Sequence, residues 1–395
     1  MKKIIILFLL FCTYSLYSQS ESLTLLEADK LISAKKYESA FKVLDEFDKT
    51  NSIPDIVMAK LDILLNYFVF SVNHRNFSLK DLDANENILD IRGKEGIYSV
   101  HNFPADTIIN NLLKKYPNNC KLYNSLGTYY YEMFQYFNEK PPIEVHTLHG
   151  LIISNYKKVI DGKCDNFMTH YAIGFIYAIR SNYRESIPYL KKSIELNNKF
   201  PNSLYNLAFI YTILKDNTNA LKYAELAFEQ YNDNKLKSDA ARLIGNLQMS
   251  NKDTVSALKY YEKANELLPN NYFNIKPLIT LYAKNNASKF TEYSKKFYEL
   301  EPTNPTIYND LVAIYKDNNK IEVLIDFLKS QLNNPKNNNL INANLNFYLG
   351  TASLNVNKKK AKEYYLKAKE IFNLVYKPDH DVFKSIEEGI KKSEN

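Results

Sequence analysis

The sequence predicts an all-α fold, a right-handed α-solenoid in which antiparallel pairs of helices repeat along the chain. The first observation is a small or packing residue that recurs after a first interval of 47 residues and then every 33 to 38 residues, at Gly127, Gly174, Ala208, Gly245, Ile279, Val312 and Gly350. The second is a tyrosine three residues later in most repeats, at Tyr130, Tyr177, Tyr211, Tyr282 and Tyr315. The third is a pair of small residues seven positions apart in the segment that follows, as at Ser186 and Ser193 or Ala257 and Ala264.

These spacings fit two short helices that pack on each other. A helix of about 13 residues is marginal on its own, whereas two antiparallel helices bury a shared apolar face. Gly174 costs about 1 kcal/mol relative to alanine in a helix interior, so its place in a repeat indicates the close approach of a second helix. Each pair still exposes a face that the next pair covers, which gives a solenoid held by neighbour contacts.

The composition argues against several functional classes. The chain has 395 residues, of which 45% are hydrophobic, and its nine glycines form no phosphate-binding loop. It contains no G-x-S-x-G, H-E-x-x-H, Walker A or C-x-x-C motif. The formal net charge of +7 is spread along the chain, which is weak evidence for a nucleic-acid partner. We therefore expect no catalytic residue, no cofactor, no bound metal and no nucleic acid.

The first twenty residues have the pattern of an export signal. Two lysines precede an apolar run from Ile4 to Leu10, and small residues follow, ending at Ser20. The residue before Cys12 is large, which disfavours a lipoprotein signal. We expect cleavage of residues 1–20 and a periplasmic, cell-surface or secreted protein, with a retained N-terminal anchor as the alternative. No later segment approaches 18 consecutive apolar residues, so we expect no integral membrane segment in the mature chain.

Two stretches carry a resemblance to a known family. YNSLGTYY, which begins at Tyr123, and ALKYYEKANELLP, which begins at Ala257, resemble the tetratricopeptide repeat. That family has L-G-x-x-Y on a first helix, then A-x-x-x-F/Y-x-x-A and a proline on a second. The resemblance covers residues 21–373 as eight or nine units, several of them degenerate, and residues 374–395 predict a polar C-terminal capping helix and tail. It implies a concave groove, lined by the first helices, that binds a protein or peptide.

Two insertions interrupt the repeat, at residues 74–103 and 136–150. Each is expected between the two helices of its unit, so both should emerge at the same edge of the array. Loops of this length are either functional or disordered, and tolerated drift is the alternative. In the second insertion His146 and His149, with Glu144 nearby and His170 as a third candidate, have the spacing of metal ligands. Solvated side chains are the simpler interpretation.

Lysine doublets recur on the expected second helices. They lie at residues 114–115, 157–158, 191–192 and 295–296. Their regular spacing predicts a basic stripe on the outer, convex surface. We interpret this stripe as a solvated face, and the alternative is attraction to anionic envelope polymers or lipid headgroups.

The resemblance also implies a disulfide. In the tetratricopeptide frame Cys120 precedes the first helix of the third unit and Cys164 follows the second helix. Antiparallel helices bring those two ends together, and an exported protein meets an oxidising compartment. We expect a Cys120–Cys164 disulfide, with two free and partly buried thiols as the alternative.

The resemblance further suggests which residues line the groove. The first-helix positions that point away from the packed small residue are Met168, Tyr171, Phe175, Ile179, Asn202, Tyr205, Phe209 and Ile213, followed by Arg242 and Asn246. Arg242 and Asn246 correspond to half of the carboxylate clamp of chaperone-binding family members, but Pro277 stands where the next unit should supply a donor. The alternative is that the aromatic side chains pack against neighbouring first helices.

The leading hypothesis is a non-enzymatic protein–protein interaction scaffold of the cell envelope. It would hold a partner segment, apolar and then acidic, in the groove of the superhelix. One alternative is an envelope enzyme or metal-binding protein with a site in the insertions. Another is a regulatory or sensory module, although no effector domain accompanies the repeats. The sequence does not identify the partner.

Overall fold

The computed structural model of the protein describes residues 19–137 and 140–394. Almost all of the expected signal segment 1–20, including Cys12, lies outside the described residues. The chain divides into two compact units, Met1–Ile210 (unit 1) and Tyr211–Asn395 (unit 2), and each is described by itself. No helix of the described residues has the length and apolar character needed to cross a membrane.

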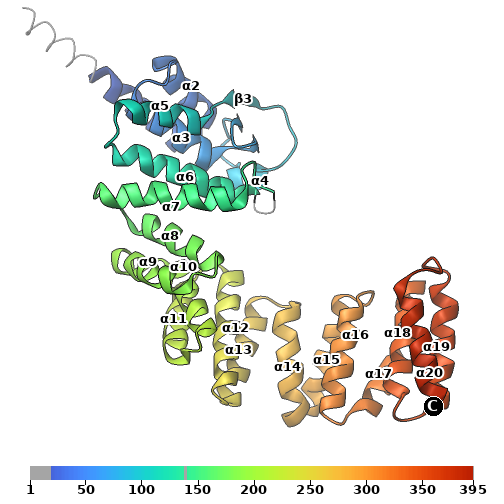
Figure 1. The fold of residues 1–395 in the computed structure, drawn as a ribbon. Coiled ribbons are helices and arrows are strands. Elements are labelled where there is room, and N and C mark those ends of the chain that lie inside the picture. The colour runs from blue at the N-terminus through green and yellow to red at the C-terminus, as the bar shows by residue number, and fades with distance from the viewer. Residues whose placement is uncertain (1–18, 138–139, 395) are drawn as a thin grey trace, which may run out of the picture. The chain divides into compact units, whose positions relative to one another are not determined.

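Unit 1 contains helix pairs and a small sheet (Figure 1). Residues 19–33 are helical. The elements that follow are α2 Tyr37–Phe47, α3 Pro54–Tyr67, β1 Phe70–Val72, β2 Asn76–Leu79, α4 Ile88–Ile91, β3 Ser99–Asn102, α5 Ala105–Lys115, α6 Cys120–Phe137, α7 Val145–Asp161, α8 Phe167–Ile179 and α9 Tyr183–Leu196. α10 Pro201–Ile213 crosses the boundary into unit 2.

Unit 2 consists of helices throughout its described residues. They are α11 Asn217–Gln230, α12 Asn234–Ser250, α13 Thr254–Leu267, α14 Tyr272–Asn285, α15 Ala287–Leu300, α16 Pro305–Asp317, α17 Ile321–Leu332, α18 Asn339–Ser353, α19 Lys358–Phe372 and α20 Asp381–Glu394. α12 packs on α13, α14 on α15 and α18 on α19, as the repeat predicts. Within each unit the fold is the all-α solenoid of helix pairs expected from the sequence.

Asparagine and aspartate define where many of these helices begin. Asp253 Oδ1 accepts a hydrogen bond of 3.0 Å from the backbone N–H of Ser256 at the start of α13. The residue before this cap, Lys252, has a left-handed backbone with φ of 64°. Lys215 and Asp216 repeat the arrangement at the start of α11. Polar caps of this kind satisfy the free N–H groups of a first turn, and Asn271, Asn304 and Asn357 cap α14, α16 and α19 in the same way.

The small positions bring paired helices into contact. In α8 a Cβ atom added to Gly174 would lie 2.8 Å from Leu190 Cγ and 3.2 Å from the Leu190 backbone nitrogen. The hydroxyl of Ser186 donates a 2.6 Å hydrogen bond to the carbonyl oxygen of Gly174. Side chain and backbone of α9 therefore occupy the space that any larger residue would need, which explains the helical glycine.

The C-terminal helix, α20, packs on α19 around an aromatic ring. Tyr365 of α19 is buried, and a Cβ atom added to Gly350 of α18 would lie 3.0 Å from its ring. A Cβ atom added to Gly389 of α20 would clash with the same ring. Phe383 and Ile386 of α20 are buried with it. Tyr365 thus lies between two helices that both need glycine at the point of contact.

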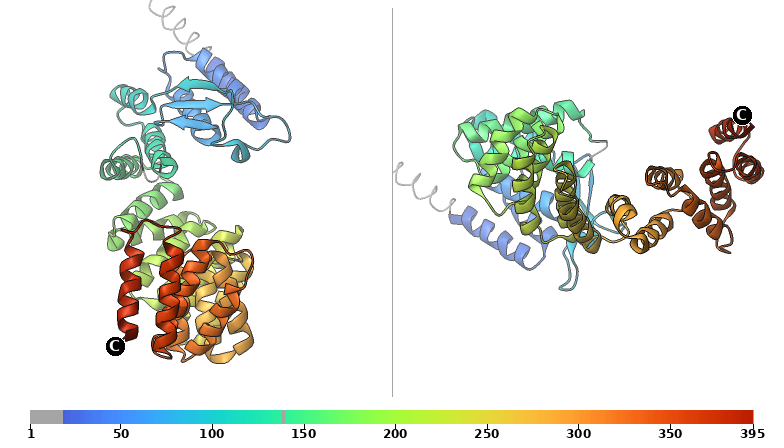
Figure 2. Two further views of the ribbon diagram at one scale, coloured as in Figure 1. Left: turned by 90° about the vertical axis from the view of Figure 1, so that its right-hand side faces the viewer. Right: turned by 90° about the horizontal axis from the view of Figure 1, so that it is seen from below.

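The insertion in the second pair differs from the expected loop. It begins at Phe70 rather than at residue 74, and it carries an antiparallel sheet in the order β1-β2-β3, drawn as arrows in Figure 2. Phe70 pairs with Ser78 and Ser78 with Val100. Phe77 of the central strand is fully buried. The central strand thus packs into unit 1, while Phe70 and Val100 of the outer strands are exposed, and the sheet is an insertion in the all-α solenoid.

The second insertion is shorter than expected. α6 continues to Phe137 and α7 already begins at Val145, so the expected segment 136–150 overlaps both helices. Glu144 caps α7 by accepting hydrogen bonds from the backbone N–H groups of His146 and Thr147, at 2.9 and 2.8 Å. His146 and His149 therefore lie on a helix and not in a loop.

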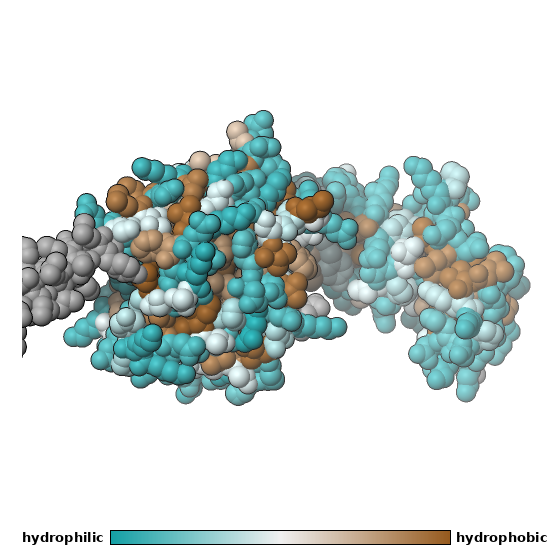
Figure 3. Space-filling model, turned by 90° about the horizontal axis from the view of Figure 1, so that it is seen from above, coloured by the Kyte–Doolittle hydropathy of each residue, from teal (hydrophilic) through white to brown (hydrophobic). Residues whose placement is uncertain are grey.

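The surface is mixed in polarity. On the face drawn in Figure 3, hydrophobic side chains form separate patches between hydrophilic ones. Elsewhere, exposed large apolar residues include Phe209 on α10 and Phe273 on α14. Because scattered exposed apolar side chains are normal, a candidate site needs further evidence from its own geometry.

Candidate functional site

The expected groove residues of unit 1 differ in accessibility. Tyr171 is only 7% exposed, and its ring lies 4.9 Å from Phe200 and 5.7 Å from Phe175, measured between centroids. Asn206 Nδ2 donates a 3.4 Å hydrogen bond to the Tyr171 hydroxyl. Burial raises the pKa of this phenol above its usual value. Tyr171 is therefore an interior residue, contrary to the expectation that it lines an open surface.

Other expected groove residues remain accessible. Phe209 is 48% exposed, and Ile179 is exposed as well. Met168, Phe175 and Tyr205 are half-buried. Helix faces in unit 1 thus offer single exposed or half-buried apolar side chains.

The remaining expected residues belong to unit 2. Ile213 is exposed in the last turn of α10, Asn246 is exposed on α12 and Arg242 is half-buried on the same helix. Arg242 and Asn246 line a pocket of about 440 Å³ between α12 and α14. Its other lining residues are Met249, Tyr261, Tyr272, Phe273, Lys276, Pro277, Thr280 and Leu281. We call this the α12–α14 pocket.

Arg242 is positioned by an acidic and an aromatic neighbour. Its Nη2 donates a 2.6 Å hydrogen bond to Asp239 Oδ1, one turn earlier in α12. The guanidinium carbon lies 5.5 Å from the centroid of the Phe273 ring, a cation–π distance. Phe273 itself is 61% exposed. The pocket therefore presents a positive charge directly beside an open aromatic face.

Asn246 is oriented by the second helix of its own pair. The Tyr261 hydroxyl donates a 2.7 Å hydrogen bond to Asn246 Oδ1. Burial raises the pKa of Tyr261 to about 12, so the phenol keeps its proton at neutral pH. Because Asn246 accepts through its oxygen, its amide nitrogen remains a donor for a ligand.

The other side of the pocket carries a neutralised cation. Lys276 Nζ lies 2.7 Å from Asp310 Oδ1 of α16, and the Tyr272 hydroxyl donates to the other oxygen of Asp310. Burial and the hydrogen bond to Asp310 both raise the pKa of Tyr272. Asp310 thus pairs with Lys276 as Asp239 pairs with Arg242, and Arg242 is the cation that lies against the exposed Phe273 ring.

Sequence reasoning missed Phe273 and Lys276, although a signal was present. They lie 34 positions after Asp239 and Arg242, at the same places in the next first helix. Applying the repeat offset one unit further would have placed both in the groove. The groove prediction considers only Pro277 in this helix and not Lys276, the cation directly before it.

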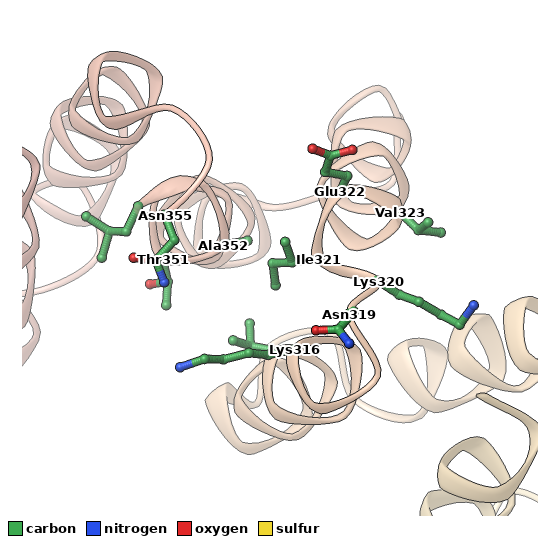
Figure 4. Close-up of a pocket in the computed structure, with 11 residues that line it drawn as sticks. Lys316, Asn319, Lys320, Ile321, Glu322, Val323, Thr351, Ala352 and Asn355 are labelled. Atoms are coloured by element: carbon green, nitrogen blue, oxygen red, sulfur yellow. The ribbon is translucent and has the colours of Figure 1, made fainter. Parts of the chain in front are cut away.

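A larger hollow of about 840 Å³ lies between α16, α17 and α18 (Figure 4). Ile321 and Ala352 lie toward its centre, while Lys320 and Glu322 extend away from it. Val312 lines it at the small position of this repeat. The α16–α17 pair lacks the glycine and the alanines that other pairs have at their small positions. Larger side chains occupy these positions, and the hollow lies beside them.

The histidines considered as metal ligands have other partners. Arg180 donates from Nε to His149 Nδ1 at 3.4 Å, and its Nη2 lies 3.2 Å from His146 Nδ1. His170 Nε2 lies 2.7 Å from Asp165 Oδ2. A guanidinium between His146 and His149 is incompatible with a cation held at the same nitrogens. Within the described residues, no group of three or more His, Cys, Asp or Glu side chains could hold a metal ion.

Cys120 and Cys164 are joined in the structure. Their sulfur atoms form a disulfide, and the two Cα atoms are 6.3 Å apart. Cys120 is the first residue of α6, and Cys164 follows α7. The bond therefore connects the two open ends of one helix pair.

No protein-family model and no curated protein matches the chain. Several solved structures are similar to it at low identity. A tetratricopeptide repeat protein from Parabacteroides merdae is 16% identical, with 69% of this chain and 99% of that one covered and a TM-score of 0.41. The C-terminal part of a TPR repeat-containing protein from Cytophaga hutchinsonii is 15% identical, covering 65% and 93%, with a TM-score of 0.44.

PilF from Pseudomonas aeruginosa is 15% identical, with 53% of this chain and 87% of that one covered and a TM-score of 0.41. The molecule's own packing shows antiparallel helix pairs with a small residue at several of the close contacts. The helix pairs therefore pack in the manner of the tetratricopeptide repeat that the sequence resembles.

Proposed function

We propose that the protein is a non-enzymatic scaffold that binds a segment of a partner protein on its first helices. The α12–α14 pocket is the observation that carries this proposal. It combines an exposed aromatic ring, Phe273, with the guanidinium of Arg242 and the amide of Asn246. A binding pocket with an apolar wall and a few convergent polar groups suits a side chain next to a carboxylate.

The chemistry of the pocket specifies the segment. Phe273, Met249 and Leu281 provide apolar surface for an aromatic or aliphatic side chain. A carboxylate of the same segment would accept hydrogen bonds from Arg242 and from the Asn246 amide. Asp239 competes for Arg242, because it already holds one guanidinium nitrogen at 2.6 Å. The proposed ligand is therefore an apolar and acidic peptide segment, and nucleic acid is not the proposed partner.

We also propose that the protein acts outside the cytoplasm, in the periplasm or at the cell surface. The basic and apolar pattern of residues 1–20 supports export. The pairing of Cys120 with Cys164 supports an oxidising compartment. Both observations concern residues far from the pocket, so this part of the proposal is independent of the ligand.

The test uses an array of immobilised peptides that vary an aromatic or aliphatic residue and a neighbouring carboxylate. Binding of the full chain is compared with that of Arg242→Gln and Phe273→Ala. Each substitution should weaken binding about tenfold, equivalent to about 1.4 kcal/mol. Leu374→Ala is the matched control, since Leu374 is also exposed and lies outside the pocket. Asp239→Asn should strengthen binding, because it releases Arg242.

Melting temperatures within experimental error of the parent would show that the variants fold. The proposal is refuted if carboxylate-containing peptides bind Arg242→Gln as well as the parent chain. Equal losses in Phe273→Ala and Leu374→Ala would also argue against the pocket, because the control residue does not line it.

A further inference from the structure

One edge of unit 2 is formed by the turns within its helix pairs. Successive helices run antiparallel, so these turns all lie at one end of the unit, the lower end in Figure 1. The connections between pairs lie at the opposite end. The turns comprise residues 214–217, 251–255, 284–287, 316–323 and 354–360. We call this set the turn edge.

Contacts show that neighbouring turns lie side by side. Asn217 Nδ2 donates a 3.0 Å hydrogen bond to Asn251 Oδ1, which joins the first two turns. Lys320 Nζ lies 5.8 Å from the ring centroid of Phe290, near the start of α15. The hollow in Figure 4 is lined by both residues 319–323 and residues 351–355. These contacts join the first turn to the second, and the third helix pair to the fourth and fifth turns, along one end of unit 2.

The turn edge is basic. Its residues include eight lysines and four carboxylates, whereas the connections at the opposite end include two lysines and three carboxylates. These connections are residues 231–234, 268–271, 301–305, 333–338 and 373–380. The eight lysines are Lys215, Lys252, Lys284, Lys316, Lys320, Lys358, Lys359 and Lys360. The structure shows an ion pair for none of these eight within the described part of the chain.

The lysine doublets of the second helices behave differently. Lys192 pairs with Glu195, Lys296 with Glu292 and Lys295 with Glu299. Two of the four carboxylates on the turn edge, Asp216 and Asp253, are engaged as helix caps. Unneutralised positive charge therefore gathers on the turn edge of unit 2, whereas the lysine doublet of the same unit, Lys295 and Lys296, is paired within its own helix.

Exposed aliphatic side chains accompany these lysines. Val255, which follows Lys252 in the same turn, is 79% exposed. Leu214, Val323 and Val356 are exposed in three further turns. Four of the five turns thus combine a lysine with an exposed aliphatic side chain. On an edge that only faces water, lysines would be expected to pair with Asp or Glu. Unpaired lysines beside exposed valine and leucine instead suit a membrane surface, where lysine meets lipid headgroups and the aliphatic side chains meet acyl chains.

We propose that the turn edge binds the surface of an anionic lipid bilayer. The lysines would contact lipid phosphates while the aliphatic side chains enter the headgroup boundary. A row of turns at one end of a helical unit can meet a flat surface along its length. This inference goes beyond the proposed function and uses none of the residues of the α12–α14 pocket, so either can fail alone.

The test measures co-sedimentation of the full chain with phosphatidylcholine vesicles, with and without phosphatidylglycerol. All variants keep residues 1–20 unchanged, so that this apolar segment contributes equally. The edge variant replaces Lys252, Lys316, Lys358 and Lys360 with glutamine. The control variant makes the same change at Lys235, Lys336, Lys377 and Lys384, which are also exposed but lie away from the turn edge.

Each lysine near an anionic surface contributes roughly fivefold in affinity, so the edge variant should bind phosphatidylglycerol vesicles at least ~100-fold more weakly. The control variant should lose less than about threefold, through net charge alone. Binding by the parent should fall at high ionic strength and be weak on phosphatidylcholine alone. Equal losses in the two lysine variants would overturn the proposal, as would equal binding to neutral vesicles.

A second variant separates a bilayer from a soluble polyanion. Val255→Ser, Val323→Ser and Val356→Ser together leave all eight lysines in place. On vesicles they should weaken binding about tenfold or more, because burying each valine favours the membrane. If this triple variant binds vesicles as tightly as the parent, the edge recognises charge alone and a soluble acidic polymer replaces the bilayer as its partner.

Discussion

Replacing Gly174 with alanine tests how closely α8 and α9 pack. A Cβ atom at this position would lie 2.8 Å from Leu190 Cγ and 3.2 Å from the Leu190 backbone nitrogen. The leucine side chain can rotate, but the backbone of α9 cannot yield without moving the helix. Gly150 of α7 is the matched control, because a Cβ atom there would meet nothing within 4 Å.

The expected free energies follow from two opposing effects. Alanine in place of a helical glycine stabilises by about 1 kcal/mol, and this gain applies at both positions. Overpacking at Gly174 costs about 1–3 kcal/mol. We therefore expect Gly174→Ala to destabilise the protein by about 1 kcal/mol, whereas Gly150→Ala should stabilise it by about 0.5–1 kcal/mol.

The assay is native-state hydrogen exchange of the amides of α8 and α9, together with urea unfolding. Local exchange is needed because solenoids do not always unfold as one cooperative body. Faster exchange in α8 and α9 of Gly174→Ala, with slower exchange in α7 of Gly150→Ala, is the expected result. If both variants gain stability equally, the helices do not pack as closely as the structure shows.

Three further predictions concern unit 1. Tyr171→Ala should lower the free energy of unfolding by about 3 kcal/mol or more, as for other emptied aromatic sites, whereas Phe209→Ala should cost under about 1 kcal/mol; similar losses would contradict their different burial. Non-reducing peptide mapping should recover Cys120 linked to Cys164, and reduction should destabilise the chain by about 2–4 kcal/mol; two alkylatable thiols in untreated protein would refute the bond. Burial lowers the pKa of His74 to about 4, below its unfolded value of 6.5, so the unfolded chain takes up the proton first and stability falls as pH drops from 6.5 toward 4. The loss from His74 should approach about 3 kcal/mol, so His74→Phe should lose less stability than the parent over that pH range, measured by urea unfolding. Burial also lowers the pKa values of His101 and His149, which contribute equally in both chains.

The repeat was predictable because close helix packing requires small residues at regular positions, which are visible in the sequence. Gly174 and Gly245 mark close contacts, and the following alanines and serines mark the second helices. The sheet was not predictable from local pattern. Its strands have three or four residues, and β2 pairs with β3 across a long intervening segment that carries no strand periodicity.

The candidate site was predictable only where its residues lie at fixed positions of the repeat. Repeat offsets placed Arg242 and Asn246 correctly on an accessible face of α12. They placed Tyr171 wrongly, because its burial depends on Phe200 in the connection between repeats, which has no fixed offset. The role of Asp310 in neutralising Lys276 likewise depends on a helix two elements later in the chain.

The packing of α20 on Tyr365 bears on whether a solenoid with fewer helix pairs could carry the same last helix. α20 meets α19 at this tyrosine, which lies between Ala361 and Ala368, and buries Phe383 and Ile386 in the same contact. α13 presents the same arrangement, with Tyr261 between Ala257 and Ala264 and its ring against Gly245. The tyrosine surface on which α20 packs therefore has a counterpart on α13. We expect that α20, if grafted after α13, would meet a tyrosine held in the same way between two alanines.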